Sequence, residues 1–232
     1  GTTADKRKYG FRRAFTFRPH LLKGMLSISG WTMVQSFISV SIWFIFFLAI
    51  EHLGERPLAV TNIVRNISAL LIMVISAFAT TAGALISNQI GAGEQRYLFR
   101  TCGMTLNLTY AILVPLLVIL CLFPEPVLRV FTDNPSLIAA SINSVYVMST
   151  STLIMAPAFI LFNAVSGTGN TKAGFIMEMI SLTVYTAAVY YIVIRLKPDV
   201  ALCWFSEHVY GIALIALAWW YLKSGKWRGK KV

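Results

Sequence analysis

The sequence predicts an all-α integral membrane protein built as a six-helix transmembrane bundle. Hydrophobic residues make up 57% of the 232 positions and charged residues 12%, whereas about a quarter of the residues in a soluble domain are charged. Mean hydropathy is +0.70. Six apolar runs each exceed the roughly 20 residues that a helix needs to cross the hydrocarbon of a bilayer. Together these features exclude a soluble globular domain.

The apolar runs lie between two short basic ends. Residues 1–23 are predicted to form a basic cytoplasmic linker, 24–222 the transmembrane lobe and 223–232 a basic cytoplasmic tail. The chain begins Gly-Thr-Thr, which favours a processed product or a fragment. The six runs cover residues 24–50, 58–96 (which closes in a Gly-Ala-Gly turn), 98–123, 137–165, 173–194 and 200–222.

Lys and Arg concentrate on one side of the predicted membrane. Six crossings put both termini on the same side, and that side carries fifteen of the twenty basic residues against four on the other. Because basic residues beside membrane spans favour the cytoplasmic face, we expect a multi-pass protein of the inner or plasma membrane with both termini cytoplasmic. The net charge of +11 is thus explained without nucleic acid.

The second run carries a line of small and polar residues at helical spacing. In lipid, such a face marks contact with other helices, because hydrocarbon solvates apolar side chains well. The line predicts a helix–helix seam, or a seam that also faces a polar cavity with Asn62 and Asn66 at its outer end. Its members are Asn62, Asn66, Ala69, Met73, Ser76, Thr80, Gly83 and Ser87.

The first and fourth runs carry similar lines. The first has Ser29, Thr32, Ser36, Ser39 and Trp43, with Gln35 beside them, and the fourth has Ser149, Thr152, Ala156, Phe159 and Asn163. From these lines we take seven candidates for the lining of a substrate cavity, although each could equally be a helix-packing residue. They are Gln35, Ser39, Trp43, Asn62, Asn66, Phe159 and Asn163.

Proline and asparagine give local predictions for the fourth run. Thr132-Asp133-Asn134-Pro135 offers a polar N-cap followed by proline in the first helical turn. Pro157, inside the run, should free one backbone carbonyl, which a neighbouring helix must then satisfy.

Three charged residues fall well inside apolar runs: Arg65, Glu178 and Glu207. Such residues are costly in lipid and are therefore functional candidates. Arg65 and Glu207 lie at similar depth, which permits an ion pair, but Arg65 could instead extend outward to the interface. Glu178 could carry protons or be solvated near the headgroups. The sequence contains no cluster of His and carboxylate residues that would predict a metal site, and the three cysteines show no metal-binding spacing.

An intramembrane serine protease is the alternative from the enzyme class. Ser166 precedes a glycine, and His208 lies in the last run, a faint likeness to the rhomboid family. Rhomboids carry their serine at the start of the fourth helix, whereas Ser166 closes the fourth run here. Ser166 and His208 would then lie in opposite halves of the membrane, too far apart to share a proton. We therefore expect no enzymatic activity.

Four stretches together resemble the multidrug and toxic compound extrusion (MATE) family. They are Ile90-Gly91-Ala92-Gly93, Phe131-Thr132-Asp133-Asn134-Pro135, the stretch from Phe162 to Thr171, and Ser224-Gly225-Lys226-Trp227. Their order and spacing are similar to those of the C-terminal half of such a transporter, across almost the whole chain.

The resemblance implies one lobe of a twelve-helix transporter. The missing N-terminal six-helix lobe would be the partner, the substrate cavity would lie between the lobes, and entry of H⁺ or Na⁺ would drive export; no other cofactor is implied. Some members place a cation-binding carboxylate in the first or fourth helix of this half. The runs 24–50 and 137–165 contain no acid, so coupling carboxylates are expected in the missing half.

The sequence thus favours secondary-active antiport of amphipathic organic cations by alternating access between two lobes. Aromatic and polar side chains would hold such substrates. The second hypothesis is a lipid-linked oligosaccharide flippase of the same superfamily, which would need cationic side chains in its cavity. The third is the intramembrane protease.

Overall fold

The computed structural model describes residues 19–225 and 227–228. Most of the predicted linker and most of the predicted tail lie outside this part of the chain, as do the side chains of Ser29 and Thr32. Within the described residues, six helical segments are long and apolar enough to cross a membrane. The all-α, six-helix prediction is therefore confirmed.

The long helices keep close to the predicted runs, with α2 beginning about one turn earlier than expected. They are α2 (Pro19–Glu51), α3 (Glu55–Gly91), α4 (Leu98–Leu122), α6 (Pro135–Gly167), α7 (Thr171–Val189) and α9 (Phe205–Ser224). Short elements connect or extend them: η1 (Gln95–Tyr97), α5 (Pro124–Arg129), the π-helical η2 (Tyr190–Leu196) and α8 (Val200–Cys203).

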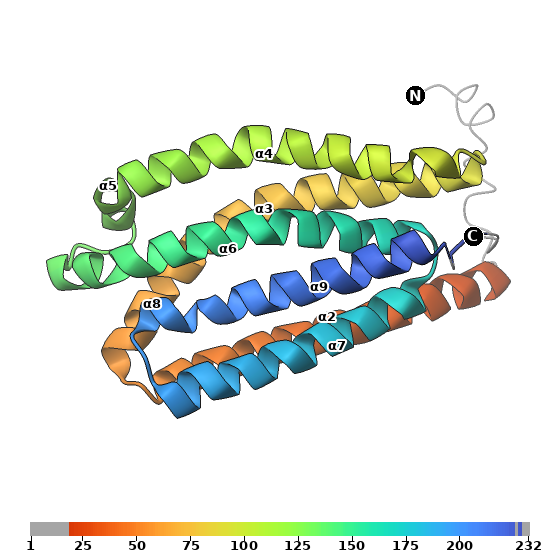
Figure 1. Ribbon diagram of the computed structural model, residues 1–232. Coiled ribbons are helices and arrows are strands. Elements are labelled where there is room, and N and C mark those ends of the chain that lie inside the picture. Colours follow the sequence, from red (N-terminus) through yellow and green to blue (C-terminus); the bar gives the residue numbers. More distant parts are fainter. Residues whose placement is uncertain (1–18, 226, 229–232) are drawn as a thin grey trace, which may run out of the picture.

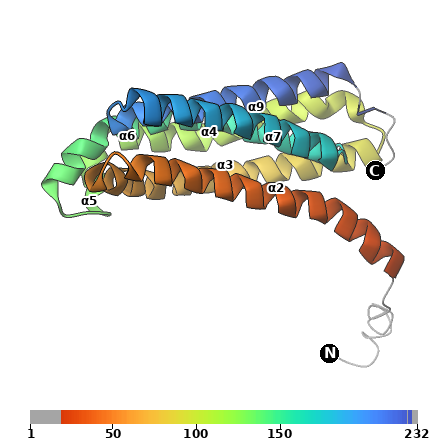
Figure 2. The same ribbon diagram turned by 90° about the horizontal axis from the view of Figure 1, so that it is seen from below.

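Helix α6 lies at the centre of the bundle and packs against α3. Their mutual packing is the most extensive in the protein; α4 covers one side of the pair, while α9, α7 and α2 follow on the other (Figure 1). Figure 2 shows the first turns of α2 diverging from the remaining helices. We call the end of the bundle where α2 begins and α9 finishes the termini end.

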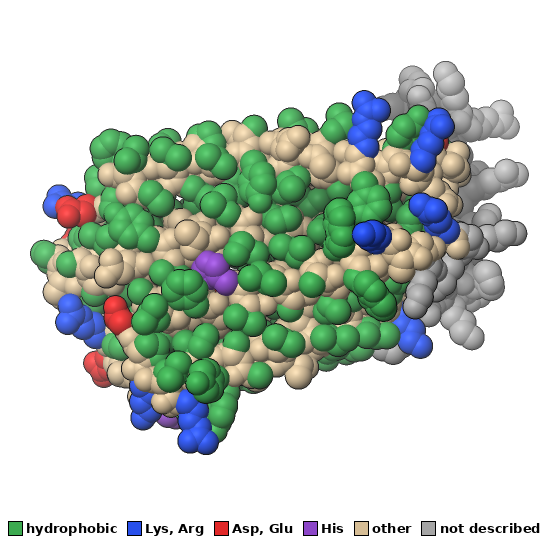
Figure 3. All heavy atoms as spheres, in the orientation of Figure 1, with side chains coloured by type: hydrophobic (Ala, Val, Ile, Leu, Met, Phe, Trp, Pro, Cys, Tyr) green, Lys and Arg blue, Asp and Glu red, His purple; other side chains and the backbone are tan. Residues whose placement is uncertain are grey.

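Charged side chains gather at the two ends of the bundle, and the face seen in Figure 3 is mostly apolar between them. Many large apolar side chains of the long helices are exposed, among them Phe37, Leu70, Ile119 and Trp220. This distribution suits a bundle whose outer surface meets hydrocarbon and whose ends meet water.

The prediction that the small and polar line of α3 packs against other helices is wrong for the helices of this chain. The buried face of α3 is apolar and includes Val64, Leu71 and Ile75, whereas Asn66 and Met73 are exposed. The small and polar line points away from α6 over most of its length, because α3 has neighbours on only one side. Only near the termini end, at Gly83, does the line enter a helix contact.

The predicted line on α6 is confirmed as an interior face. Ser149, Thr152 and Ala156 are buried, and both hydroxyl groups donate to carbonyls of their own helix, Val145 O and Met148 O. These polar side chains are thus satisfied without reaching another helix.

Glycines let α3 and α6 touch backbone to backbone near the termini end. A Cβ added to Gly83 would lie 2.9 Å from the Asn163 carbonyl oxygen, and one added to Gly167 would collide with the Gly83 backbone. Close approach of this kind is the main way in which helices associate where the hydrophobic effect is absent. The turn after α6 follows at once, with Gly169 at φ +78°.

The proline and cap predictions for the fourth helix are confirmed. Asn134 is the N-cap of α6, its side chain accepts from the Ser136 backbone N–H, and Pro135 is the first helical residue. Pro157 cannot donate to the carbonyl of Leu153, four residues earlier, and the Tyr110 hydroxyl of α4 donates to that carbonyl at 2.8 Å. A neighbouring helix thus supplies the missing donor.

We expect Tyr110→Phe to destabilise the protein, because it leaves the Leu153 carbonyl without a donor inside the bundle. The cost of such an orphaned group is about 1–3 kcal/mol. Thermal unfolding of the purified full-length protein in detergent would measure it. The matched control is Tyr146→Phe, whose exposed hydroxyl reaches the Cys121 carbonyl only at 3.5 Å. Equal effects of the two variants would contradict the role given to Tyr110.

Gly167→Ala should be destabilising, because the new methyl group meets the Gly83 backbone and α3 must move outward. Overpacking of this kind costs about 1–3 kcal/mol. Gly103→Ala, in α4, is the control, since nothing lies within 4 Å of the added Cβ. It should be neutral or stabilising by up to about 1 kcal/mol, because alanine is the better helix former. The folded yield and unfolding temperature of both variants would decide.

Candidate functional site

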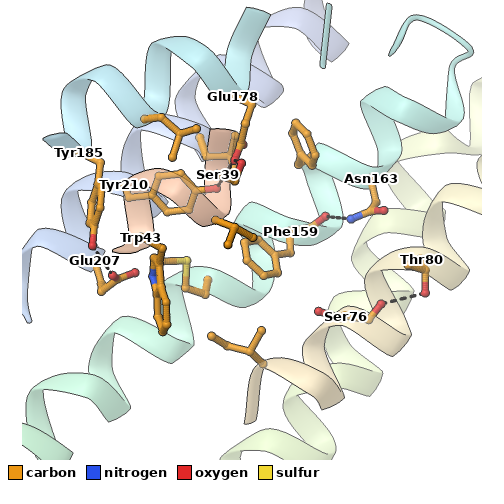
Figure 4. A pocket seen from close by; sticks show the side chains of 16 residues that line it. Ser39, Trp43, Ser76, Thr80, Phe159, Asn163, Glu178, Tyr185, Glu207 and Tyr210 are labelled. Atoms are coloured by element: carbon orange, nitrogen blue, oxygen red, sulfur yellow. Dashed lines mark hydrogen bonds between the residues drawn. The ribbon is translucent and has the colours of Figure 1, made fainter. Parts of the chain in front are cut away.

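A cavity of about 420 Å³ lies among five of the long helices, on the side of α6 away from α4. The residues around it are mostly aromatic, apolar or hydroxyl-bearing, and two are acidic (Figure 4). They come from α2 (Ser39, Val40, Trp43), α3 (Ile72, Ser76, Thr80), α6 (Met155, Phe159, Phe162, Asn163), α7 (Glu178, Leu182, Tyr185) and α9 (Glu207, Tyr210, Leu214).

Four of the seven cavity candidates lie on this wall: Ser39, Trp43, Phe159 and Asn163. The other three lie elsewhere. Asn62 donates to the Leu58 carbonyl of its own helix, Asn66 is exposed on α3, and Gln35 is half-buried on α2 beyond the cavity wall. The polar line of α3 does reach the cavity, but through Ser76 and Thr80.

Glu178 is buried, with 4% of its surface exposed. Its Oε1 accepts from the Ser39 hydroxyl of α2 and the Tyr210 hydroxyl of α9, both at 3.0 Å, and Tyr210 also lies 3.2 Å from Oε2. The interpretation of Glu178 as a side chain solvated near the headgroups is therefore wrong. Three helices enclose its carboxyl group at the cavity wall.

Glu207 is also buried, at 8% exposed, and accepts from the Tyr185 hydroxyl of α7 at 3.0 Å. The predicted ion pair with Arg65 is not formed: the Arg65 guanidinium lies 5.0 Å from the centre of the Phe47 ring, and its Nε has no hydrogen-bond partner among the described residues. Equal depth was not sufficient for pairing, because Arg65 faces α2 whereas Glu207 faces α7.

The two glutamates form a reciprocal arrangement that we call the Glu–Tyr clamp, made of Glu178, Tyr185, Glu207 and Tyr210. Helices α7 and α9 run in opposite directions, and each contributes one Glu and one Tyr (Figure 4). Each Glu accepts from the Tyr of the other helix. The two Tyr rings contact each other edge to face, with centroids 5.9 Å apart.

Sequence reasoning identified both glutamates but missed the tyrosines. Spacing could have revealed them: Tyr185 follows Glu178 by seven residues and Tyr210 follows Glu207 by three, and such offsets lie on one helix face.

The clamp has no basic partner at the cavity. No Lys, Arg or His is among the described residues that line it. Two basic or titratable side chains within these helices face elsewhere. His208 contacts the Thr150 hydroxyl at 2.9 Å, and Arg65 lies over Phe47. Among the described residues, the carboxyl groups therefore accept hydrogen bonds from neutral groups only, namely the hydroxyls of Ser39, Tyr185 and Tyr210 and the Trp43 indole beside Glu207.

The geometry also excludes the proposed protease pair. His208 contacts Thr150, which lies sixteen residues before Ser166 on the same helix. At 1.5 Å per residue the two groups are about 24 Å apart. Ser166 and His208 cannot exchange a proton across that distance.

Comparison with known proteins identifies the family. The family described as MatE matches residues 32–192, more than half of the chain. The probable multidrug resistance protein NorM of Thermotoga maritima is 24% identical over 213 residues, which cover 90% of this chain and 46% of NorM. The chain thus spans about half the length of the relatives it matches.

Solved structures share the fold. The Vibrio cholerae MATE transporter VcmN in its bent form has a TM-score of 0.80 at 16% identity, over 90% of this chain and 48% of VcmN. A MOP superfamily transporter from Pyrococcus furiosus, reported for the reverse polarity of its binding pocket, has a TM-score of 0.75 at 12% identity. The match covers 86% of this chain and 44% of that transporter. The likeness covers 86–90% of this chain. The family match shows that this chain belongs to the MatE family of transporters.

Proposed function

We propose that this chain is one lobe of a secondary-active exporter of amphipathic organic cations. The observation that carries this proposal is the acidic, aromatic cavity: two buried carboxyl groups, five aromatic side chains and no basic residue among the described lining. A buried acidic wall favours positively charged ligands, and aromatic faces add cation–π attraction.

The size of the cavity agrees with a small-molecule ligand. Its volume of about 420 Å³ lies within the range of about 300–1,000 Å³ that is usual for such sites. Trp43, Phe159 and Phe162 supply flat apolar surface, and Asn163 and Thr80 supply adaptable polar contacts. A surface of this kind selects for charge and apolar area more than for one hydrogen-bonding pattern.

Export would proceed by alternating access between this lobe and a second six-helix lobe. The second lobe is inferred from the relatives, of whose length this chain spans about half. The bare face of α3, with Asn66 and Met73, is a surface on which it could pack. Residues 1–23 would then be the cytoplasmic connection, and the bias of Lys and Arg supports cytoplasmic termini.

Entry of H⁺ or Na⁺ would drive export. The flippase alternative is not favoured, because a pyrophosphate group needs cationic side chains, and the described lining offers none. Pocket polarity is informative in this superfamily, since reverse polarity was taken to suggest a different function for the Pyrococcus furiosus relative.

Cells that express the full-length gene should export ethidium, and Trp43→Ala should weaken this export. Loss of a desolvated cation–π contact worth about 2 kcal/mol raises the half-saturating concentration by about thirtyfold. Trp219→Ala is the control, because Trp219 is exposed on α9 and packs against Phe99. Collapse of the proton and sodium gradients in separate experiments would identify the driving ion. Export that is indifferent to both gradients would contradict secondary transport.

Matched threonines test which surfaces meet water. In full-length protein with Cys102, Cys121 and Cys203 replaced by alanine, Thr80→Cys should react with a hydrophilic maleimide, whereas Thr183→Cys should not. Both threonines are exposed and donate to carbonyls of their own helices, but only Thr80 lines the cavity. A thiol in hydrocarbon does not ionise, so its rate should be at least about tenfold lower. Equal rates would place Thr80 among acyl chains.

A further inference from the structure

The Glu–Tyr clamp is unusual because it buries two carboxyl groups within the helix bundle without a basic partner among the described residues. Glu178 follows the start of α7, at the termini end, by seven residues, and Glu207 follows the start of α8, at the other end, by seven. Each carboxyl group is thus about 10 Å inside its own end of the bundle. A buried carboxylate that lacks a positive partner is strongly disfavoured. The clamp therefore needs a cation of some kind.

The groups that surround the clamp cannot supply that charge. From α2 it meets Ser39 and Trp43, from α3 the cavity residues Ser76 and Thr80, and from α6 the cavity residues Phe159 and Asn163, none of which titrates in the accessible range. The remaining titratable groups at the cavity are Tyr185 and Tyr210 themselves. The positive charge must therefore come from a proton or a ligand.

The hydrogen-bond partners of the clamp suit a group that changes its protonation state. Ser39, Tyr185 and Tyr210 are hydroxyls, and a hydroxyl can donate to a carboxylate or rotate and accept from a carboxylic acid. The Trp43 indole N–H beside Glu207 is the exception, because it can only donate. Arg or Lys could only donate and would fix the anion. One turn from Glu178 on the same helix face lies Ser181, fully buried, whose hydroxyl has no partner among the described residues. A spare hydroxyl adds capacity for rearrangement.

We propose that the Glu–Tyr clamp is a cation-exchange site: each of its two carboxyl groups holds a proton when the cavity is empty, and one of them releases its proton when the charged group of an organic cation binds beside it. This inference rests on the proposed function and deepens it. In the exchange the O–H bond of one glutamic acid breaks and the proton passes to water in the cavity. The carboxylate then pairs with the ligand cation, so one positive charge enters and one leaves.

The site lies on other helices than those on which some members of the family carry a cation-binding carboxylate. Those members place it on the first or the fourth helix of this half, which here correspond to α2 and α6. The lining residues from α2 and α6 include no acid, and both acids come from α7 and α9. The exchange site would thus be in this lobe, and the expectation that all coupling carboxylates lie in the other half would not hold.

A proton fits the clamp better than sodium does. Sodium needs several oxygen atoms that face it at once, whereas Glu178 and Glu207 accept from different hydroxyl groups, so the oxygen atoms of the clamp are divided between two places. Among the described residues, no cluster of three or more His, Cys, Asp or Glu side chains could hold a metal ion.

The test is calorimetric titration of the purified full-length protein with tetraphenylphosphonium in buffers of different ionisation enthalpy. The wild type should release about one proton per bound cation, and its affinity should rise by up to about tenfold per pH unit wherever the proton is displaced. The double variant Glu178→Gln/Glu207→Gln should release no proton and bind at least tenfold more weakly. Glu125→Gln, an exposed acid on α5, should behave as the wild type does.

A second measurement uses the unaltered protein and does not depend on the folding of a variant. A hydrophobic carbodiimide modifies protonated carboxyl groups in apolar surroundings. Mass spectrometry should locate the modification on Glu178 or Glu207, and tetraphenylphosphonium should prevent it. Absence of modification at both residues would overturn the proposal.

The outcomes separate the clamp from the transport function. Proton release that persists in the double variant would overturn the clamp and leave organic-cation transport intact. Competition by sodium at fixed pH without proton release would likewise reject proton exchange. A wild type that neither binds nor exports organic cations would overturn both proposals.

Discussion

Hydrocarbon offers no hydrogen-bond partner, and most polar contacts in this protein follow from that constraint. Ser149 and Thr152 donate to carbonyls of their own helix, so they lie inside the bundle at little cost. Where Pro157 interrupts α6, a tyrosine hydroxyl from α4 satisfies the freed carbonyl. The carboxyl groups of the Glu–Tyr clamp follow the same rule, because each accepts from a hydroxyl on a facing helix. One requirement thus governs both the stability of the bundle and the chemistry of its cavity.

Local features of the fold could be predicted from the sequence, whereas the orientation of helix faces depended on how many neighbours a helix has. The spans and the Asn134 cap follow from residues next to one another in the chain. The line on α6 was predicted correctly because α6 is central, with 56% of its most apolar window buried. The corresponding value for α3 is 28%. One face of α3 is bare, and no periodicity within α3 indicates which face the other helices leave uncovered.

The acids illustrate a second limit of sequence reasoning. Their position inside apolar runs identifies Glu178 and Glu207 as unusual, because charged residues are rare at that depth in a membrane. Depth did not identify their partners, since pairing depends on the direction in which each helix face points. Arg65 therefore seemed a suitable partner for Glu207, yet it lies over Phe47. The tyrosines could have been found by asking which side chains share a helix face with each acid.

Stability and chemistry lie in different parts of the bundle. The backbone contact of Gly83 with Gly167 fixes α3 against α6, while the clamp joins α7 to α9 through hydroxyl groups that can rotate without moving a helix. Exchange of a proton for another cation therefore need not displace the helices itself. The exchange would instead change the free-energy cost of closing the cavity. Closure over a charged, unpaired carboxylate is unfavourable, whereas closure over a carboxylate neutralised by a proton or a ligand cation is not. The transporter would then change access when the clamp carries a proton or a ligand cation, and would not do so when the clamp is empty and charged. This is the condition for strict exchange.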